Sequence, residues 1–329
     1  MNPLGPVAFF ALLTMINGLR CYGDVGSPVD SWFAIKEPKG TSYVYYDAVT
    51  PLTPSAHSLN ETSGGALATT LAQLWSTGTE YILFNDEPPV GSVSNATVGH
   101  TKGVWAWNNA DGGAFVLTHS IPLFPKGPGL VPAYVGLGDN ARTYGQTLGC
   151  FSLSVGTLNS IARQMGLTIP DIYDSRITSG TPAALAALAA GRVSKQAVCN
   201  STAIQTVGGS AVTHFAKSTA WNNELYSACV APGLQQSLFA ETWIRGSAVG
   251  PSCSGNYHVN DVIRLELPFN DTFKETQDHS KWAVGITYVC VGDINRMTTQ
   301  YKRGGGAFCV RDAGLAAALN ATIVTANGC

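Results

Sequence analysis

Residues 99–107 read GHTKGVWAW, and residues 278–285 read DHSKWAVG. Both stretches place a His-x-Lys triplet at the head of an apolar, strand-like run. In each case a second apolar run follows and ends in polar residues, FVLTHS at 115–120 and YVCVGDIN at 288–295. The two triplets are separated by about half of the chain. We interpret them as matching parts of a diverged duplication.

The spacing within each triplet suits phosphoryl chemistry. Side chains at positions i and i+2 of a strand project from the same face, so His100 lies beside Lys102 and His279 beside Lys281. A lysine can neutralise the non-bridging oxygens of a phosphate, while an imidazole attacks phosphorus or transfers a proton. The simpler alternative is a pair of strand ends with solvated lysines and hydrogen-bonded histidines.

Strand-like and helix-like segments alternate along the chain. Runs of β-branched and aromatic residues predict strands at 31–36, 42–49, 102–107, 114–124, 145–155, 210–219, 237–245 and 282–291. Helical patterns lie at 66–77, 156–166, 181–192 and 312–320. This alternation predicts an α/β or mixed α+β fold with mixed sheets. The stretch 178–208, rich in Ala, Gly, Ser and Thr, is the candidate seam between the halves.

The amino-terminal segment predicts export. Residues 3–16 are apolar but too few to span a bilayer, and Gly18 then offers a cleavage position, so residues 1–18 are predicted to be a signal peptide. A buried core helix is the alternative for this segment. No later segment has the length and apolar character of a membrane anchor.

The cysteines and the glycosylation sequons agree with export. The chain has 8 cysteines but no CxxC pair or tight Cys/His cluster, so we expect four disulfides in an oxidising compartment instead of a structural zinc site. N-x-S/T sequons, which predict a glycoprotein, occur at Asn60, Asn95, Asn200, Asn270 and Asn320.

The composition excludes several classes of protein. The 329 residues carry 19 Lys+Arg and 21 Asp+Glu without a basic run, which excludes a polybasic nucleic-acid-binding arm. No H-E-x-x-H motif or acidic group with metal-ligand spacing is present, so no metal is expected, and the absence of GxSxG argues against a serine hydrolase. Protonation of all 6 histidines would raise the formal charge of −2 by six units, to +4, in an acidic compartment.

Longer motifs resemble the deoxyribonuclease II family. They follow the family's order along the chain: CYGDVGSPVDSWFAIKEP (21–38), YILFNDEPP (81–89), GHTKGV (99–104), DGGAFVLTHSIPLFP (111–125), TYGQTLGCFSL (143–153), DHSKWAV (278–284), CVGDINRM (290–297) and RGGGAFCV (303–310). Residues 156–235 carry the least resemblance.

The resemblance implies a fold and an activity. The fold would be a pseudo-dimer of two phospholipase D-like halves within one catalytic domain, 19–329, with pseudo-repeats at about 19–177 and 209–329. The activity would be that of an acid endonuclease that cleaves double-stranded DNA without a cofactor, through a phosphohistidine, leaving 3′-phosphate and 5′-hydroxyl ends. The protein would be lysosomal or secreted, without a membrane anchor or an obligate protein partner. The alternative is a secreted DNA-binding or toxin-like member with reduced or lost catalysis.

The resemblance also implies which residues act. They are the two His-x-Lys units, a further histidine and an asparagine that orients the second unit: His100, Lys102, His279, Lys281, His119 and Asn295. The phospholipase D pattern places an aspartate after the lysine, and Asn108 or Asp111 would have to serve here. Which histidine is the nucleophile stays open.

The family pattern also implies disulfide pairs. It joins Cys21 to Cys150, Cys253 to Cys329 and Cys290 to Cys309. Cys199 and Cys229 are then left to pair with each other.

Overall fold

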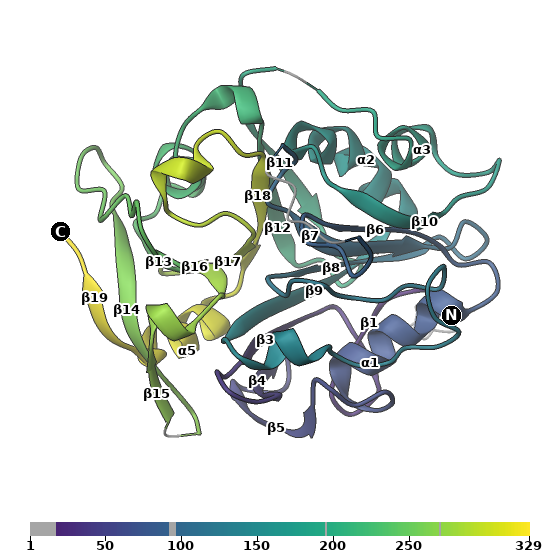
Figure 1. The fold of residues 1–329 in the computed structure, drawn as a ribbon, viewed down its shortest axis with the longest axis horizontal. Helices are drawn as coiled ribbons and strands as arrows, with labels where there is room; N and C mark the ends of the chain where they lie inside the picture. The colour runs from purple at the N-terminus through teal and green to yellow at the C-terminus, as the bar shows by residue number, and fades with distance from the viewer. Residues whose placement is uncertain (1–17, 92–96, 195, 270) are drawn as a thin grey trace, which may run out of the picture.

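Two large β-sheets dominate the computed structural model, which describes residues 18–91, 97–194, 196–269 and 271–329 (Figure 1). In spatial order, the first sheet consists of β10 (Ile172–Arg176), β6 (Glu80–Asn85), β7 (Lys102–Trp107), β8 (Gly113–His119), β9 (Gln146–Ser154), β3 (Ser31–Lys36), β4 (Ser42–Asp47) and β5 (Thr53–Ser58). The second consists of β11 (Cys199–Gln205), β12 (Ala211–Lys217), β18 (Gly305–Arg311), β17 (Tyr288–Gly292), β16 (Lys281–Val284), β13 (Leu238–Thr242), β14 (Val259–Leu267) and β15 (Asp271–Lys274), with β19 (Ile323–Asn327) also on β14. Strands β1 (Cys21–Tyr22) and β2 (Pro28–Val29) form a separate ribbon.

Helices are few and short. The α-helices are α1 (Gly65–Ala72), α2 (Val155–Met165), α3 (Ala183–Ala189), α4 (Ala231–Leu234) and α5 (Ala313–Thr322), and a π-helical turn, η5 (Tyr226–Val230), precedes α4. Single 3₁₀ turns are η1 (Gln73–Trp75), η2 (Asp139–Arg142), η3 (Gly166–Thr168), η4 (Thr219–Trp221), η6 (Glu275–Gln277) and η7 (Thr298–Gln300). The predicted mixed fold of strands and helices is confirmed.

Several predicted strands need correction at their ends. The run 114–124 leaves the sheet after His119, because Pro122 and Pro125 have no N–H to donate to a ladder. The run 282–291 is not one strand but a hairpin of β16 and β17. The sequence patterns did not predict the two-residue strands β1 and β2, nor β5, β6, β10, β11, β14, β15, β18 and β19.

The strand order repeats in the two sheets. The run β6-β7-β8-β9-β3 in the first sheet matches β13-β16-β17-β18-β12 in the second, and every neighbouring pair within both runs is antiparallel. A helix follows the fourth strand in each, with α2 touching β8 and α5 touching β17. This order agrees with a duplication, while the boundaries 19–177 and 209–329 stay a prediction. Strand β11 lies within the stretch expected to be the seam.

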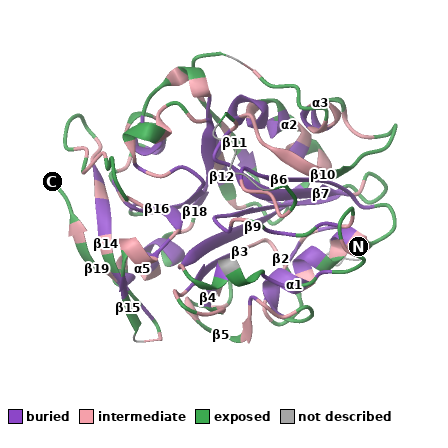
Figure 2. Ribbon diagram, in the orientation of Figure 1, coloured by how far each residue is buried: buried purple, intermediate pink, exposed green. Residues whose placement is uncertain are grey.

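The core lies between the two sheets and continues on their outer faces. The central cluster joins residues of both sheets and of α2 and α5, among them Trp105, Phe151, Trp282 and Phe308. Helix α1 covers the outer face of the first sheet, and η5 with α4 covers that of the second. The central strands are buried along most of their length, whereas the outer loops are exposed (Figure 2).

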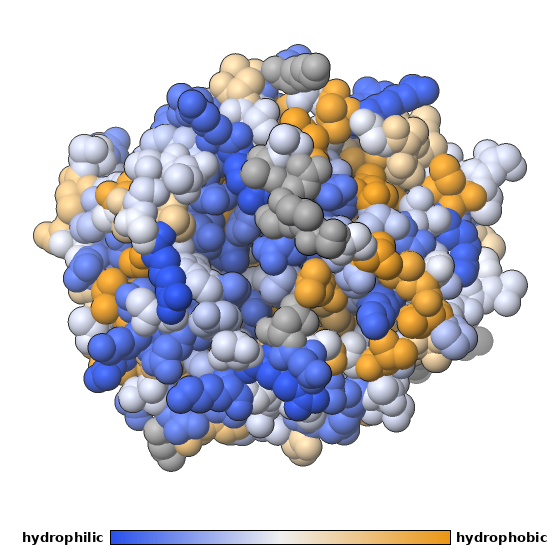
Figure 3. Space-filling view, viewed as in Figure 1, coloured by the Kyte–Doolittle hydropathy of each residue, from blue (hydrophilic) through white to orange (hydrophobic). Residues whose placement is uncertain are grey.

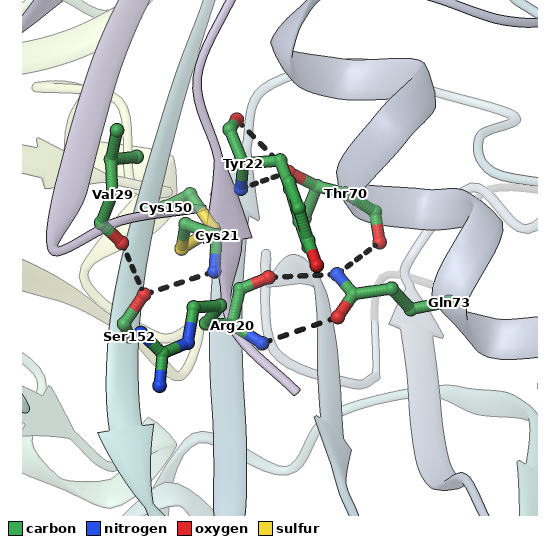
Figure 4. Close-up of a disulfide and its surroundings, with 8 residues drawn as sticks. All are labelled: Arg20, Cys21, Tyr22, Val29, Thr70, Gln73, Cys150 and Ser152. Atoms are coloured by element: carbon green, nitrogen blue, oxygen red, sulfur yellow. Dashed lines mark hydrogen bonds between the residues drawn. A yellow bond between two sulfur atoms is a disulfide. The ribbon is translucent and has the colours of Figure 1, made fainter. Parts of the chain in front are cut away.

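All four expected disulfides are present: Cys21–Cys150, Cys199–Cys229, Cys253–Cys329 and Cys290–Cys309. Cys21 fastens the start of the described chain to β9, where its N–H also donates to Ser152 Oγ at 2.9 Å (Figure 4). On the other side, Tyr22 N–H donates to Thr70 Oγ1 of α1 at 3.0 Å. The predicted signal peptide lies outside the described residues except for Gly18. No helix within the described ranges is long and apolar enough to cross a membrane.

Candidate active site

The two His-x-Lys units meet in one pocket. A cavity of about 360 Å³ is lined by His100, Lys102, His279 and Lys281 together with Asn295. Its remaining lining residues are Glu87, Ser120, Pro122, Trp243, Arg245, Met297 and Gln300. The view in Figure 3 shows a largely hydrophilic surface that is hollowed near its middle. Residues from the two halves of the chain thus lie together in one pocket, and the sequence predicted that the two units face each other.

Each lysine starts a central strand, and each histidine precedes it. Lys102 is the first residue of β7 and Lys281 the first of β16. The main-chain N–H group of each histidine donates to a carbonyl of the other half. The N–H of His100 donates to Gly304 at 2.8 Å, and the N–H of His279 donates to Gly145 at 2.9 Å. Gly304 precedes β18 and Gly145 precedes β9, which are equivalent strands. Each histidine is therefore docked on the other half.

A main-chain carbonyl fixes the tautomer of His100. Its Nδ1 lies 2.6 Å from the carbonyl oxygen of Asp293. Because a carbonyl only accepts, Nδ1 carries the hydrogen, and Nε2 of the neutral ring keeps its lone pair. Burial, and then Lys102, hold the pKa of His100 well below its ordinary value. The ring is therefore neutral in the unliganded protein.

Asp86 is the buried counter-charge of this first unit. Its carboxylate pairs with Lys102 Nζ and, at 3.0 Å, with Arg303 Nη2, and it lies 3.8 Å from His100 Nε2. Burial alone would raise the pKa of Asp86, but Lys102, His100 and Arg303 outweigh it and hold that pKa well below its usual range. Asp86 therefore stays ionised.

Aromatic rings surround the second histidine. The His279 ring stacks on Tyr144, with centroids 4.4 Å and planes 3° apart, and Trp243 contacts both rings. His279 Nε2 is buried and has no hydrogen-bond partner among the described residues. Burial, followed by Lys281 and Lys102, holds the pKa of His279 far below its ordinary value. Burial and Lys102 also lower the pKa of Lys281 to about 7.

The registers show how the two units differ. Asn85 pairs with Lys102, and Thr242 pairs with Lys281, so the next residues along, Asp86 and Trp243, are equivalent. Arg303 and Tyr144 are also equivalent, because each precedes the glycine that accepts a histidine N–H. An ion pair beside His100 thus takes the place that an aromatic pair holds beside His279.

The other predicted site residues have mixed outcomes. Asn295 lines the pocket, and its equivalent in the first half, Pro122, does so too. His119 does not line it: the ring is fully buried, packs on Phe124 and accepts the N–H of Ile121 at 3.2 Å through Nδ1.

The expectation that Asn108 or Asp111 serves as the acidic partner is wrong. Their side chains accept N–H groups of the turn at the far end of β7 from His100. An extended strand separates that turn from the pocket. The carboxylate at the first unit instead comes from the neighbouring strand, β6, and is that of Asp86.

Comparisons with known proteins agree with this arrangement. A family model described as deoxyribonuclease II matches residues 20–329. The chain belongs to the deoxyribonuclease II family. It is 35% identical to deoxyribonuclease-2-alpha of Sus scrofa, covering 94% of this chain and 91% of that protein, and 33% identical to deoxyribonuclease-2 of Caenorhabditis elegans, covering 94% and 93%. It is 36% identical to a putative deoxyribonuclease-2 of Burkholderia thailandensis, with 86% of each chain covered. The protein is a deoxyribonuclease II-type nuclease.

Sequence reasoning missed several residues of this deoxyribonuclease II-type pocket. Asp86 stands in the motif YILFNDEPP, where an acidic pair follows an apolar run, and this was the available signal. Tyr144 stands in TYGQTLGC, and no pattern linked it to His279. Trp243 and Arg245 end the predicted strand 237–245, and only the register of β13 against β16 brings them to the pocket.

One group within the described part of the chain could be considered for a metal. Asp86, Glu87 and His100 place ligand atoms within 4.8 Å of one another. Lys102 and Arg303 already contact the Asp86 carboxylate. A cation would have to displace the lysine from its counter-charge, so these residues fit a metal poorly.

Proposed function

We propose that this nuclease hydrolyses double-stranded DNA in acid, without a metal, and leaves 3′-phosphate and 5′-hydroxyl ends. The observation that carries the proposal is the meeting of both His-x-Lys units in one pocket. Two imidazoles supply a nucleophile and an acid, and two ammonium groups supply the charge that a phosphodiester in its transition state needs.

The difference between the two units supports a division of roles. His100 Nε2 attacks phosphorus and forms an N–P bond while the P–O5′ bond breaks. The leaving 5′ oxygen takes a proton from His279. Water, deprotonated by His279, then attacks phosphorus, the N–P bond breaks, and the 3′-phosphate leaves. His100 suits the first role because its hydrogen is held on Nδ1 by Asp293.

The remaining pocket residues prepare this reaction. Lys102 and Lys281 neutralise the non-bridging oxygens, and Asn295, whose Oδ1 is buried without a partner among the described residues, orients the second unit. His279 must carry a proton to act as the acid, although its pKa is low in the free protein. A bound phosphate anion raises that pKa, so binding of the substrate favours the protonated form of His279.

The compartment belongs to the same proposal. Four disulfides fit an oxidising compartment, and they fit a protein that is secreted or lysosomal. An acidic lysosome would provide the protons that His279 requires.

A plasmid-nicking assay at acid pH with EDTA tests this function. His100→Ala and His279→Ala should each lose nearly all cleavage, because paired groups act as a unit, whereas DNA binding should persist through lysines and main-chain amides. The matched control is His258→Ala, whose ring lies outside the pocket. The product ends should accept phosphate from a polynucleotide kinase without prior phosphatase treatment. Cleavage by His279→Ala at the wild-type rate would refute the paired mechanism, and an inactive wild type would favour a DNA-binding protein.

A further inference from the structure

Two fully buried lysines occupy equivalent places in the two halves. Lys36 is the last residue of β3 and Lys217 the last of β12, and both are completely shielded from solvent. Lys36 pairs with Gln146 at the start of β9, and Lys217 pairs with Gly305 at the start of β18. Neither lysine lines the pocket.

Each ammonium group gathers main-chain carbonyls. Lys217 Nζ donates to the carbonyls of Gln300 at 3.0 Å, Tyr301 at 2.9 Å and Arg303 at 2.6 Å. Lys36 Nζ donates to those of Glu37 at 2.6 Å, Gly40 at 2.9 Å and Arg142 at 3.5 Å. An ammonium has three donors and is costly to bury, so using all three on carbonyls compensates that cost.

The loops that these ammonium groups hold are the same loops whose carbonyls accept the main-chain N–H groups of the two histidines. Arg303, held by Lys217, directly precedes Gly304, whose carbonyl accepts the N–H of His100. Arg142, reached by Lys36, lies three positions before Gly145, which accepts the N–H of His279. The same two loops carry Arg303 beside Asp86 and Tyr144 beside His279. Each lysine of one half thus secures a loop that holds the histidine of the other half.

We propose that Lys217 and Lys36 are positioning residues, Lys217 for His100 and Lys36 for His279. The inference rests on the proposed function only where it treats these histidines as catalytic. Lys217 should be the more important of the two, because its shortest bond is to the residue next to the docking glycine. Two of the three hydrogen bonds of Lys36 go to carbonyls of the adjacent β3–β4 turn, and only the third reaches the loop that contacts His279.

Hydrogen exchange tests the crossed pairing without any need for activity. Lys217→Met should increase deuterium uptake in peptides that cover His100 but not in those that cover His279, and Lys36→Met should do the reverse. The matched control is Tyr45→Phe, which removes a buried bond to Asp47 on β4. Unchanged uptake at the histidines, or an equal rise at both, would overturn the proposal. If Lys217→Met does not fold, Lys217→Gln, which keeps two donors, replaces it.

Steady-state kinetics supply the catalytic readout. Displacement of a reacting group by about 1 Å can cost about 100-fold in rate, so Lys217→Met should lower kcat by one to two orders of magnitude, with KM for plasmid DNA nearly unchanged. A normal kcat together with raised exchange at His100 would overturn the positioning role. An inactive wild type would refute the proposed function and leave the exchange test standing.

Discussion

At the scale of single residues, the two His-x-Lys units are matched in backbone and different in surroundings. Asp86 holds Lys102 and Arg303 beside His100, while Trp243 and Tyr144 stack at His279. The carboxylate opposes the lowering of the His100 pKa that burial and Lys102 produce. The aromatic rings bring no such charge. The two histidines therefore have matched backbone positions and different electrostatic surroundings.

Asp86→Asn tests the importance of this charge. The substitution removes the buried carboxylate that pairs with Lys102 and Arg303, which should lower the free energy of unfolding by about 3–5 kcal/mol. The pKa of His100 should fall further, so the acid limb of kcat/KM should move to lower pH. Chemical denaturation and a pH–rate series measure both effects. Glu87→Gln, a half-exposed neighbour in the same pocket, should cost less than about 1 kcal/mol, and an equal loss in both variants would contradict this account.

At the scale of elements, the close contact of the sheets makes the pocket possible. Strands β8 and β9 of the first sheet touch β17 of the second, and Phe151 stacks on Phe308 at 5.7 Å. Gly149 of β9 allows a close approach of the sheets, because a Cβ there would lie 2.8 Å from a methyl carbon of Val291. The first residues of β7 and β16 then converge on the same pocket.

Gly149→Ala should therefore destabilise the protein. The added methyl meets a β-branched side chain with little freedom to turn away, and overpacking of this kind costs about 1–3 kcal/mol. Thermal unfolding should show a lower Tm. The matched control is Gly156→Ala on the exposed side of α2, where the added methyl group has space. This substitution should raise the free energy of unfolding by about 0.5–1 kcal/mol. A Gly149→Ala protein as stable as the wild type would show that the sheets can separate freely.

At the scale of the whole molecule, acidification acts mainly through carboxyl groups. The expectation that all 6 histidines gain charge in acid does not hold, since burial lowers the pKa of His119 and His214 to about 3, and those of His100 and His279 also lie well below normal. Burial instead raises the pKa of Asp278 to about 6. Protonation of such a carboxyl removes negative charge from the protein in mild acid.

The rate of DNA cleavage should follow a bell-shaped pH profile in the acid range, with an optimum near pH 5. Above about pH 7 Lys281 loses its proton and no longer neutralises phosphate, and His279 in the complex also becomes deprotonated. Activity at pH 7.5 should be small, and EDTA should not change the profile. The measurement is a pH–rate series at constant ionic strength, because salt itself weakens phosphate binding. A neutral optimum, or loss of activity in EDTA, would overturn the mechanism.

Glu241 should contribute more to the stability of the fold in acid than at neutral pH. Glu241 is fully buried without a partner for either oxygen among the described residues, and burial holds its pKa well above normal. Such a carboxyl contributes stability that is fully present below its unfolded pKa and is lost as pH rises, by up to about 1.4 kcal/mol per pH unit until the folded pKa is passed. The free energy of unfolding at pH 5 minus that at pH 7.5 should therefore be smaller in Glu241→Gln than in the wild type. Glu266→Gln, on the exposed side of β14, should leave it unchanged. If both variants behave like the wild type, Glu241 does not titrate as proposed.

The sequence alone identified the family and predicted the mixed fold, and through the family pattern it implied the four disulfide pairs. It could do so because His-x-Lys spacing, strand-like runs and long motifs are local properties of the chain. The position of Asp86 beside His100 could be seen only in the folded protein, because the pairing of β6 with β7 brings the two residues together. The contacts of Tyr144 and Trp243 with His279 could likewise be seen only in the folded protein. So could the bonds of Lys36 and Lys217 to the loops that hold the histidines. Those contacts join residues distant in sequence, and their partners are chosen by strand register and by the approach of two sheets, which no local pattern records.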